Sequence, residues 1–255
     1  GNTELVEIAC GKILDIGRED GWKYFELRGA ALLQGFEPYD VYYHHHIDLR
    51  RSERELLESA SSSKRRNVKK SKRNGINVVF TESFDSMKSF YKLNCATRKK
   101  HGLPPQPFQF FKKIYKNMIS CGYGCIVEAF YDEKVIAAFV LLYFGRRAVY
   151  KYGASSEKYL SLRPNDRLMW ETIIHCKRLG YECLSLGRTK MDNLGLERYK
   201  RDWGATVDTV TSSRFSFVEK ANKAGIQSSR GITLLKNLPI WILRLAGKLM
   251  YRHVG

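Results

Sequence analysis

The stretch "GCIVEAFYDEKVIAAFVLLYFGRRAVYKYGAS", residues 124–155, decides the fold class of this chain. It contains three runs rich in β-branched, aromatic and aliphatic residues, which favour extended strands. Asp132-Glu133 separates the first run from the second, and Gly145-Arg146 separates the second from the third. Short polar turns between apolar runs are typical of hairpins, so the stretch predicts a three-stranded antiparallel meander.

Helices and strands alternate on both sides of this meander. Before it we expect a strand at 76–81, a helix from Ser83 to Gly102 and a helix after Pro107. After it we expect a loop at 156–165, a helix at 166–180, a strand at 182–187, a Gly-Arg-Thr turn at 187–189, a short helix at 194–204 and a β stretch at 206–219. This order predicts an α+β fold, in which helices flank a mixed, mostly antiparallel sheet.

The N-terminal part has a similar alternation. Residues 4–17 predict a helix, 22–28 and 41–49 predict strands, and 52–75 predict one helix that ends at Gly75. His44 and His46 would share one face of their strand, but no carboxylate at a suitable spacing accompanies them. The six cysteines show no zinc-binding spacing either, so we expect no metal.

The charge balance points to an anionic partner. Forty-four Lys and Arg against 26 Asp and Glu give a net charge of +18, which favours nucleic acid, anionic lipid or phosphorylated substrates. A hydrophobic content of 44% excludes global disorder. Unpatterned cysteines, with neither a signal peptide nor a membrane-spanning apolar run in this sequence, predict a cytoplasmic location.

The densest cationic run is "KRRNVKKSKR", residues 64–73, which holds seven cations in ten residues. On a helix, Arg65, Lys69, Lys72 and Arg73 share one broad face. Seven like charges on three turns repel one another. A role in contacting a polyanion is therefore favoured over a merely solvated face.

The C-terminal segment, residues 220–255, contains seven Lys and Arg and no acid. A helix is expected after Pro239, with Arg244, Lys248 and Arg252 along one line and Trp241, Leu245 and Leu249 along another. Two alternatives stay open for this basic amphipathic helix: docking on the domain, or peripheral contact with an anionic membrane surface.

Four ordered stretches between residues 60 and 215 carry a resemblance to a known family: "SKRRNVKKSKRNGINV", "FYKLNCATRKKHGLPPQPFQFF", "VYKYGASSEKYLSLRPNDRLMW" and "LSLGRTKMDNLGLERYKRDWGA". They resemble the GNAT acyltransferases, and most closely the FemAB-like branch of peptidoglycan-bridge aminoacyltransferases and their exopolysaccharide relatives. The resemblance implies a remnant of a first GNAT-like half at 1–60, a GNAT-like domain at 61–219 and a basic tail at 220–255.

The resemblance implies transfer of an aminoacyl or acyl group to an amine of a cell-wall or polysaccharide precursor. It implies no tightly bound cofactor, with aminoacyl-tRNA or an acyl thioester as donor. The acceptor would be anionic, either lipid-linked or a nucleotide sugar, and the protein would work at the inner face of the membrane. Two alternatives are an N-acyltransferase of exopolysaccharide assembly that uses acyl-CoA or acyl carrier protein, and a non-catalytic polyanion-binding module.

The resemblance also implies site residues. The family's aromatic-lysine pair matches Tyr199-Lys200, with tyrosine where phenylalanine is common. A fixed ammonium beside a reacting carbonyl would stabilise the negative charge that develops on oxygen. Lys200 and Tyr199 are therefore the expected catalytic residues. Arg188 and Thr189 follow the carboxyl end of a strand, which is where an α/β site binds anions. Tyr152 is a further expected substrate-binding residue.

Local patterns add Arg163, Asn165 and Arg167 at the start of a helix, where anion binding and simple capping both stay open. They also add Arg98 at the end of a helix, where it either contacts the negative end of the helix dipole or lines a substrate cleft.

One departure concerns the donor. GNAT enzymes that use acetyl-CoA have a glycine-rich loop after the fourth strand of their fold, whose backbone amides bind the pyrophosphate. This chain has no glycine between Gly153 and Gly180. An ordinary acetyl-CoA enzyme is therefore disfavoured, whereas the FemAB-like branch shares this absence.

Overall fold

The computed structural model describes residues 3–29, 33–218, 236 and 238–251. The chain divides into two compact units. Unit 1 comprises 1–44, 188–197 and 207–226, and unit 2 comprises 45–187, 198–206 and 227–255. The domain boundaries expected at residues 60 and 219 stay predictions.

The elements follow the predicted order. The helices of the described residues are α1 (Thr3–Glu19), α2 (Glu53–Ser59), α3 (Ser62–Arg73), α4 (Phe84–Lys100), α5 (Phe108–Asn117), η1 (Ile119–Cys121), η2 (Glu157–Leu162), α6 (Pro164–Arg178), α7 (Leu194–Arg201) and α9 (Ile240–Met250). The strands are β1 (Tyr24–Arg28), β2 (Glu37–Asp48), β3 (Asn77–Thr81), β4 (Gly124–Tyr131), β5 (Lys134–Phe144), β6 (Arg147–Ser155), β7 (Cys183–Lys190) and β8 (Thr206–Ser216). They form a mixed, mostly antiparallel sheet flanked by helices, which confirms the predicted fold class.

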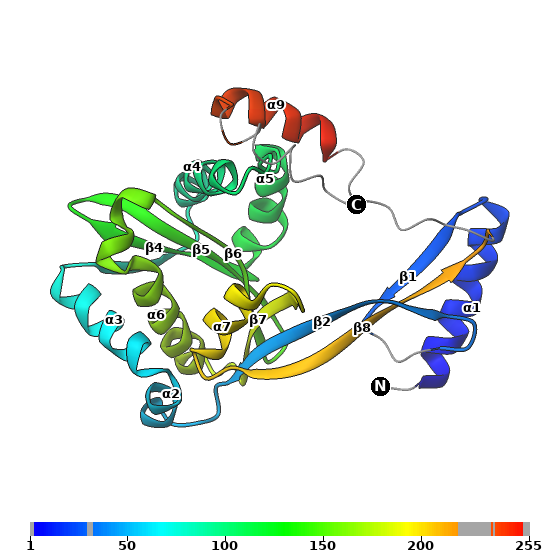
Figure 1. The fold of residues 1–255 in the computed structure, drawn as a ribbon, viewed down its shortest axis with the longest axis horizontal. Helices are drawn as coiled ribbons and strands as arrows, with labels where there is room; N and C mark the ends of the chain where they lie inside the picture. Colours follow the sequence, from blue (N-terminus) through cyan, green and yellow to red (C-terminus); the bar gives the residue numbers. More distant parts are fainter. Residues whose placement is uncertain (1–2, 30–32, 219–235, 237, 252–255) are drawn as a thin grey trace. The chain divides into compact units, whose positions relative to one another are not determined.

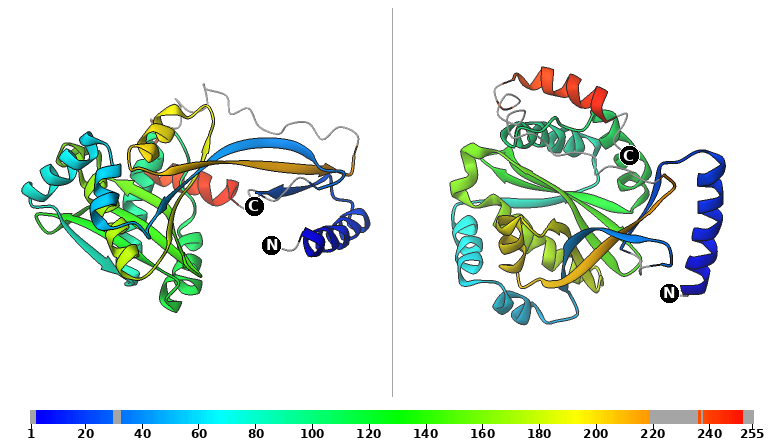
Figure 2. Two further views of the ribbon diagram at one scale, coloured as in Figure 1. Left: turned by 90° about the horizontal axis from the view of Figure 1, so that it is seen from below. Right: turned by 45° about the vertical axis from the view of Figure 1, so that its right-hand side comes forward.

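The predicted meander of β4, β5 and β6 forms the centre of unit 2. Its first turn has Asp132 at φ 50° and Glu133 at φ 59°, the left-handed conformation that two-residue hairpins require. Figures 1 and 2 show α4 and α5 over one face of these strands, and α3 and α6 over the other. Each face has its own apolar cluster, one around Phe139 and Leu168 and the other around Phe90 and Phe111.

A β-bulge changes the direction of side chains along β6. Leu141 pairs with Tyr150 and Val140 pairs with Tyr152, so Lys151 is the extra residue. Simple alternation would place Tyr150 and Tyr152 on the same face of the sheet. Because of the bulge, Tyr150 packs with Phe139 in the cluster beside α6, whereas Tyr152 packs in the cluster beside α4 and α5.

The strands β6 and β7 are paired over only part of their length. Their parallel register runs from Arg147 opposite Cys183 to Val149 opposite Ser185. Both strands continue beyond these pairs, and the bulge at Lys151 follows directly on β6. The residues of β6 after Val149 and of β7 after Ser185 therefore do not belong to the β6–β7 ladder.

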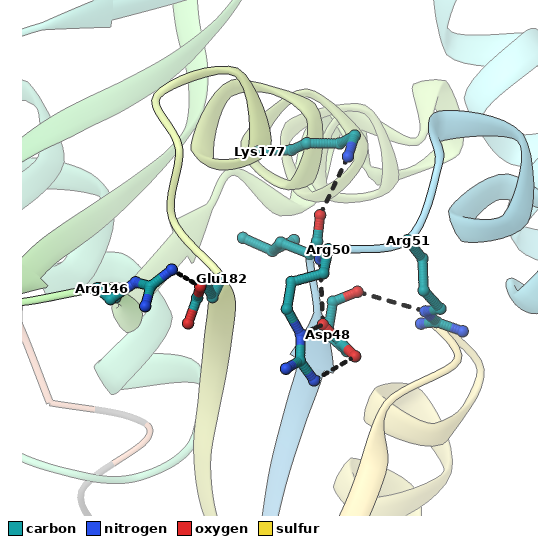
Figure 3. A network of polar contacts seen from close by, with 7 residues as sticks. Asp48, Arg50, Arg51, Arg146, Lys177 and Glu182 are labelled. Carbon is teal, nitrogen blue, oxygen red and sulfur yellow. Dashed lines mark hydrogen bonds and ion pairs between the residues drawn. The ribbon is translucent and has the colours of Figure 1, made fainter.

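The end of β2 is bound to neighbouring parts of unit 2 by polar contacts (Figure 3). The Leu49 amide donates to the Glu182 carbonyl at 2.8 Å, and Lys177 Nζ of α6 donates to the Leu49 carbonyl at 3.2 Å. Asp48 accepts two hydrogen bonds from the Arg50 guanidinium, which lower the pKa of Asp48 to about 2. These contacts hold β2 beside the start of β7.

Unit 1 has a smaller core, formed by Cys10, Leu33 and Phe36 with partly buried apolar neighbours. The strands β1 and β8 pair in antiparallel register from Tyr24 opposite Ser216 to Arg28 opposite Ser212. Across this pair, Arg214 forms an ion pair with Glu26.

Three local expectations are wrong. The single helix expected at 52–75 is two helices, because the chain is extended at Ala60 and Ser61 and the Ser61 hydroxyl caps α3 by accepting from the Lys64 amide. The loop expected at 156–165 contains the helix η2 and the first residues of α6. The expected Gly-Arg-Thr turn lies within β7, with only Gly187 in a left-handed conformation, at φ 74°.

Candidate active site

Lys200 is a buried lysine at the centre of the candidate site. It lies in the last turn of α7 and is only 4% exposed. Its Nζ donates to the Gly187 carbonyl at 2.9 Å, two residues beyond the last β6–β7 pair at Ser185. Burial lowers the pKa of Lys200 to about 8, so the side chain is mainly an ammonium at pH 7 and titrates close to physiological pH.

Tyr199 connects α7 to a buried ion pair. The Nζ of Lys64 lies 4.2 Å from the centroid of the Tyr199 ring and 5.4 Å from that of Trp203. The same Nζ donates to Asp166 Oδ1 at 2.7 Å, and Asn67 Nδ2 donates to Asp166 Oδ2 at 2.8 Å. Burial raises the pKa of the Tyr199 hydroxyl well above its ordinary value, so this side chain is neutral. Its observed contacts join α7, the helix that carries Lys200, to Lys64 of α3.

The N-terminus of α6 holds three of the predicted substrate-binding residues. Arg163 has a left-handed backbone at φ 64°, and Pro164 begins the helix. No side chain caps the first turn, because the N-cap residue is Arg163 and its guanidinium has no acceptor. Asn165 donates to Ser155 Oγ at 3.1 Å, and Asp166 is bound to α3. Arg167 forms an ion pair with Glu171 at 2.6 Å. Their contacts with a substrate stay predictions.

Two other predicted residues lie on the opposite side of the β4–β6 strands from Tyr199. Tyr152 contacts Phe90, Phe110 and Phe111, and burial raises the pKa of its hydroxyl. Arg98 donates to the Pro104 carbonyl at 3.1 Å and to the Tyr251 hydroxyl at 3.0 Å. The structure therefore separates Tyr152 and Arg98 from the cluster of Tyr199, and gives Arg98 a role in holding the loop after α4.

Arg188 and Thr189 belong to unit 1. The Arg188 guanidinium lies 4.8 Å from the centroid of the Tyr42 ring, and Thr189 is buried. Both are residues of β7. Their role in binding an anion stays a prediction.

A basic groove lies between α3 and α6. Its volume is about 450 Å³. Three of the four cations that the sequence assigned to a polyanion, Arg65, Lys69 and Lys72, line it, whereas Arg73 is not among its lining residues. The complete lining is Leu57, Ser62, Arg65, Arg66, Val68, Lys69, Lys72, Arg167 and Trp170.

Sequence reasoning missed Lys64 and Asp166. Lys64 is one of seven cations in residues 64–73, a composition that indicates a solvent-exposed helix face. The signal that marks it is the single apolar residue of α3, Val68, because residues four apart lie on the same side of a helix. Asp166 is 102 positions away in sequence, so no local pattern connects the two.

The search for related proteins identifies one family. The acetyltransferase (GNAT) domain family matches residues 58–201, which is more than half of the chain. A comparison with curated proteins finds no match.

Solved structures with the same fold include FemX, which has a TM-score of 0.63 and 14% identity over 80% of this chain and 68% of FemX. The C-terminal domain of a putative lysylphosphatidylglycerol synthetase from Agrobacterium fabrum has a TM-score of 0.64 and 15% identity, over 89% of this chain and 75% of that one. L-PGS from Bacillus licheniformis has a TM-score of 0.52 and 11% identity, over 94% of this chain and 71% of that one. These likenesses confirm, for the fold, the resemblance to FemAB-like proteins. The chain is an acyltransferase that belongs to the acetyltransferase (GNAT) domain family.

Proposed function

We propose that this acyltransferase transfers an aminoacyl or acyl group to an amine of an anionic cell-wall or polysaccharide precursor, with Lys200 as the residue that stabilises the transition state. The observation that carries the proposal is the burial of the Lys200 ammonium at the Gly187 carbonyl, where the β6–β7 ladder has ended. A buried charge is costly to keep. A catalytic role accounts for that cost.

The chemistry needs such a charge. The acceptor nitrogen attacks the donor carbonyl, a C–N bond forms, and the carbonyl oxygen becomes negative before the ester C–O bond breaks. With an aminoacyl-tRNA donor, the proton lost by the amine ends on the departing ribose hydroxyl of the tRNA. An ammonium fixed beside the carbonyl oxygen stabilises the negative charge, and the surroundings of Lys200, being nearly free of water, strengthen this attraction.

Aminoacyl-tRNA is the donor that we favour. In the segment after β6, Arg163 N donates to the Leu160 carbonyl at 3.0 Å and Arg167 N to the Arg163 carbonyl at 3.2 Å, so these two amides are already used within the chain. The segment also lacks the glycines of a pyrophosphate-binding loop, since no glycine lies between Gly153 and Gly180. The α3–α6 groove supports a nucleic-acid donor, because cations line it for phosphates and the Trp170 ring offers a stacking surface for a base.

An acyl thioester is the second candidate donor. The observation that favours it is the end of the β6–β7 ladder at Ser185, which leaves backbone groups that an extended pantetheine arm would pair with. Acyl-CoA or acyl carrier protein would supply such an arm.

The donor experiment measures transfer directly. The protein is incubated with unfractionated aminoacyl-tRNA or with acetyl-CoA, together with lipid-linked and nucleotide-sugar precursors that carry a free amine. We expect a mass increase on a precursor with aminoacyl-tRNA. Transfer from acetyl-CoA but not from aminoacyl-tRNA would make an acyl thioester the donor instead. Binding of tRNA without transfer from either donor to any precursor would favour the non-catalytic polyanion-binding module.

Reversing two charges of the α3–α6 groove is expected to weaken tRNA binding. The variant Lys69→Glu/Lys72→Glu should bind tRNA at least about tenfold more weakly, and the slope of log K against log salt should fall by about one for each phosphate that is no longer neutralised. Filter binding over a salt series measures both quantities. The matched control is Lys12→Glu/Lys23→Glu, which changes the net charge equally at exposed positions of unit 1. If both variants lost tRNA affinity equally, the effect would come from net charge alone and the groove would not be a specific tRNA-binding site.

A further inference from the structure

The helix α9 packs against the rest of unit 2 through the face of Leu243 and Gly247. Leu243 is fully buried, and a Cβ at position 247 would overlap the Pro105 carbonyl, so only glycine allows this close approach. The Arg244 guanidinium lies 5.4 Å from the centroid of the Tyr91 ring of α4. Figure 1 shows α9 beside α4 and α5. Docking on the domain, one of the two alternatives for this helix, is therefore observed for the face of Leu243 and Gly247.

The opposite face of α9 is an exposed apolar ridge. Trp241 is 68% exposed, Leu245 54% and Leu249 58%. These residues are four positions apart and so lie in one line along the helix. An apolar surface of this kind marks a contact with a partner or a membrane.

Cations and a groove border the ridge. A groove of about 810 Å³ runs between α9 and the α4–α5 side, and Lys113, Arg244 and Lys248 are its charged lining residues. A second groove of about 340 Å³ shares Gln109 and Lys113 with it. That groove adds Lys112 and Lys116 of α5, and neither groove has an acidic lining residue.

We propose that this face, formed by the α9 ridge and the α5 lysines, binds the surface of an anionic lipid bilayer. A bilayer interface offers an apolar interior for the side chains of the ridge and negative head groups for the cations around it. Tryptophan and leucine beside lysine and arginine are the side chains that such an interface accepts. No described helix is long and apolar enough to cross a membrane. The proposed contact is that of α9, which has 11 residues, lying on the bilayer surface. This face contains none of the residues around Lys200, so its binding to a bilayer does not depend on the proposed reaction.

Sedimentation with vesicles tests this proposal. Vesicles of phosphatidylcholine alone are compared with vesicles that also contain phosphatidylglycerol. The wild-type chain should bind the anionic vesicles at least about tenfold more tightly, and salt should weaken this binding. Trp241→Ser/Leu245→Ser and Lys113→Glu/Lys248→Glu should each reduce the binding by at least about tenfold.

The matched control is Leu5→Ser, which removes an apolar side chain that is 62% exposed on α1 beside Glu4. It should bind vesicles like the wild type. Equal binding to neutral and anionic vesicles would overturn the proposal, as would unchanged binding by both double variants. Loss of self-association in the ridge variant, without an effect on vesicle binding, would assign this face to contact between copies of the chain. Because the assay needs no substrate, its result is independent of whether the proposed transfer occurs.

Discussion

Replacing Lys200 with methionine is expected to lower the rate of transfer by about a hundredfold to a thousandfold, which is the usual effect of removing one donor to a developing oxyanion. The affinity for the donor should change much less, because the ammonium acts on charge that exists only in the transition state. Single-turnover kinetics with the donor identified above measures the chemical step separately from binding.

The same variant is expected to be more stable than the wild type. A pKa lowered from 10.5 to about 8 corresponds to a cost of about 3 kcal/mol for the buried ammonium at pH 7. Removal of the hydrogen bond to the Gly187 carbonyl offsets about 1 kcal/mol of this gain. Between pH 8 and 10.5 the unfolded state binds more protons, so the wild type regains stability as the pH rises. Urea unfolding at pH 7 and pH 10 measures the difference.

Opposite effects on rate and stability would separate catalysis from a structural role. The control Lys190→Met removes an exposed lysine of β7 and should change neither quantity appreciably. Lys200→Arg keeps a cation and should retain part of the rate. The wild-type rate should fall as the pH rises through about 8, where Lys200 loses its proton. An undiminished rate in Lys200→Met would refute the proposed role, and a rate that rises through pH 8 would make the neutral amine a base instead.

The order of elements was predictable because it depends on local patterns. The strands β4 and β5 are runs of buried apolar residues, and Asp132 and Glu133 form the turn between them. The break between α2 and α3 was harder to predict. Ser59, Ser61, Ser62 and Ser63 are all acceptable caps, and the choice of Ser61 accompanies the register that turns Lys64 inward.

The candidate site was predictable only in part. The motif identified Lys200, but its neighbours Arg198 and Arg201 suggest an exposed cationic helix, and only the packing of α7 makes Lys200 buried. Tyr152 illustrates a different limit. Alternation along β6 puts it on the face of Tyr150, and the bulge at Lys151 moves it to the other face. A bulge depends on pairing between strands, which the sequence of one strand does not contain.

The second large effect is expected at the buried pair of Lys64 and Asp166. The side chains are 10% and 9% exposed, so removing one partner leaves the other as a charge with little access to water. Asp166→Ala should lower the free energy of unfolding by about 3–5 kcal/mol, because it also takes the acceptor from the Asn67 amide. The exposed pair of Arg178 and Glu53 provides the control, in which Glu53→Gln should cost less than about 1 kcal/mol.

The double variant Lys64→Met/Asp166→Leu distinguishes the cost of an unpaired charge from the value of the pair. Removing both charges should recover most of the stability that Asp166→Ala removes, because apolar side chains of similar volume replace buried ion pairs at little cost. The transfer rate should stay reduced, since an ammonium no longer lies over the Tyr199 ring to position the helix that carries Lys200. Urea unfolding measures the stability, and single-turnover kinetics measures the transfer rate, of Asp166→Ala, Lys64→Met/Asp166→Leu and the control Glu53→Gln. Full recovery of stability and rate together would restrict the pair to a packing role, whereas recovery of stability alone would make Lys64 a positioning residue for Lys200.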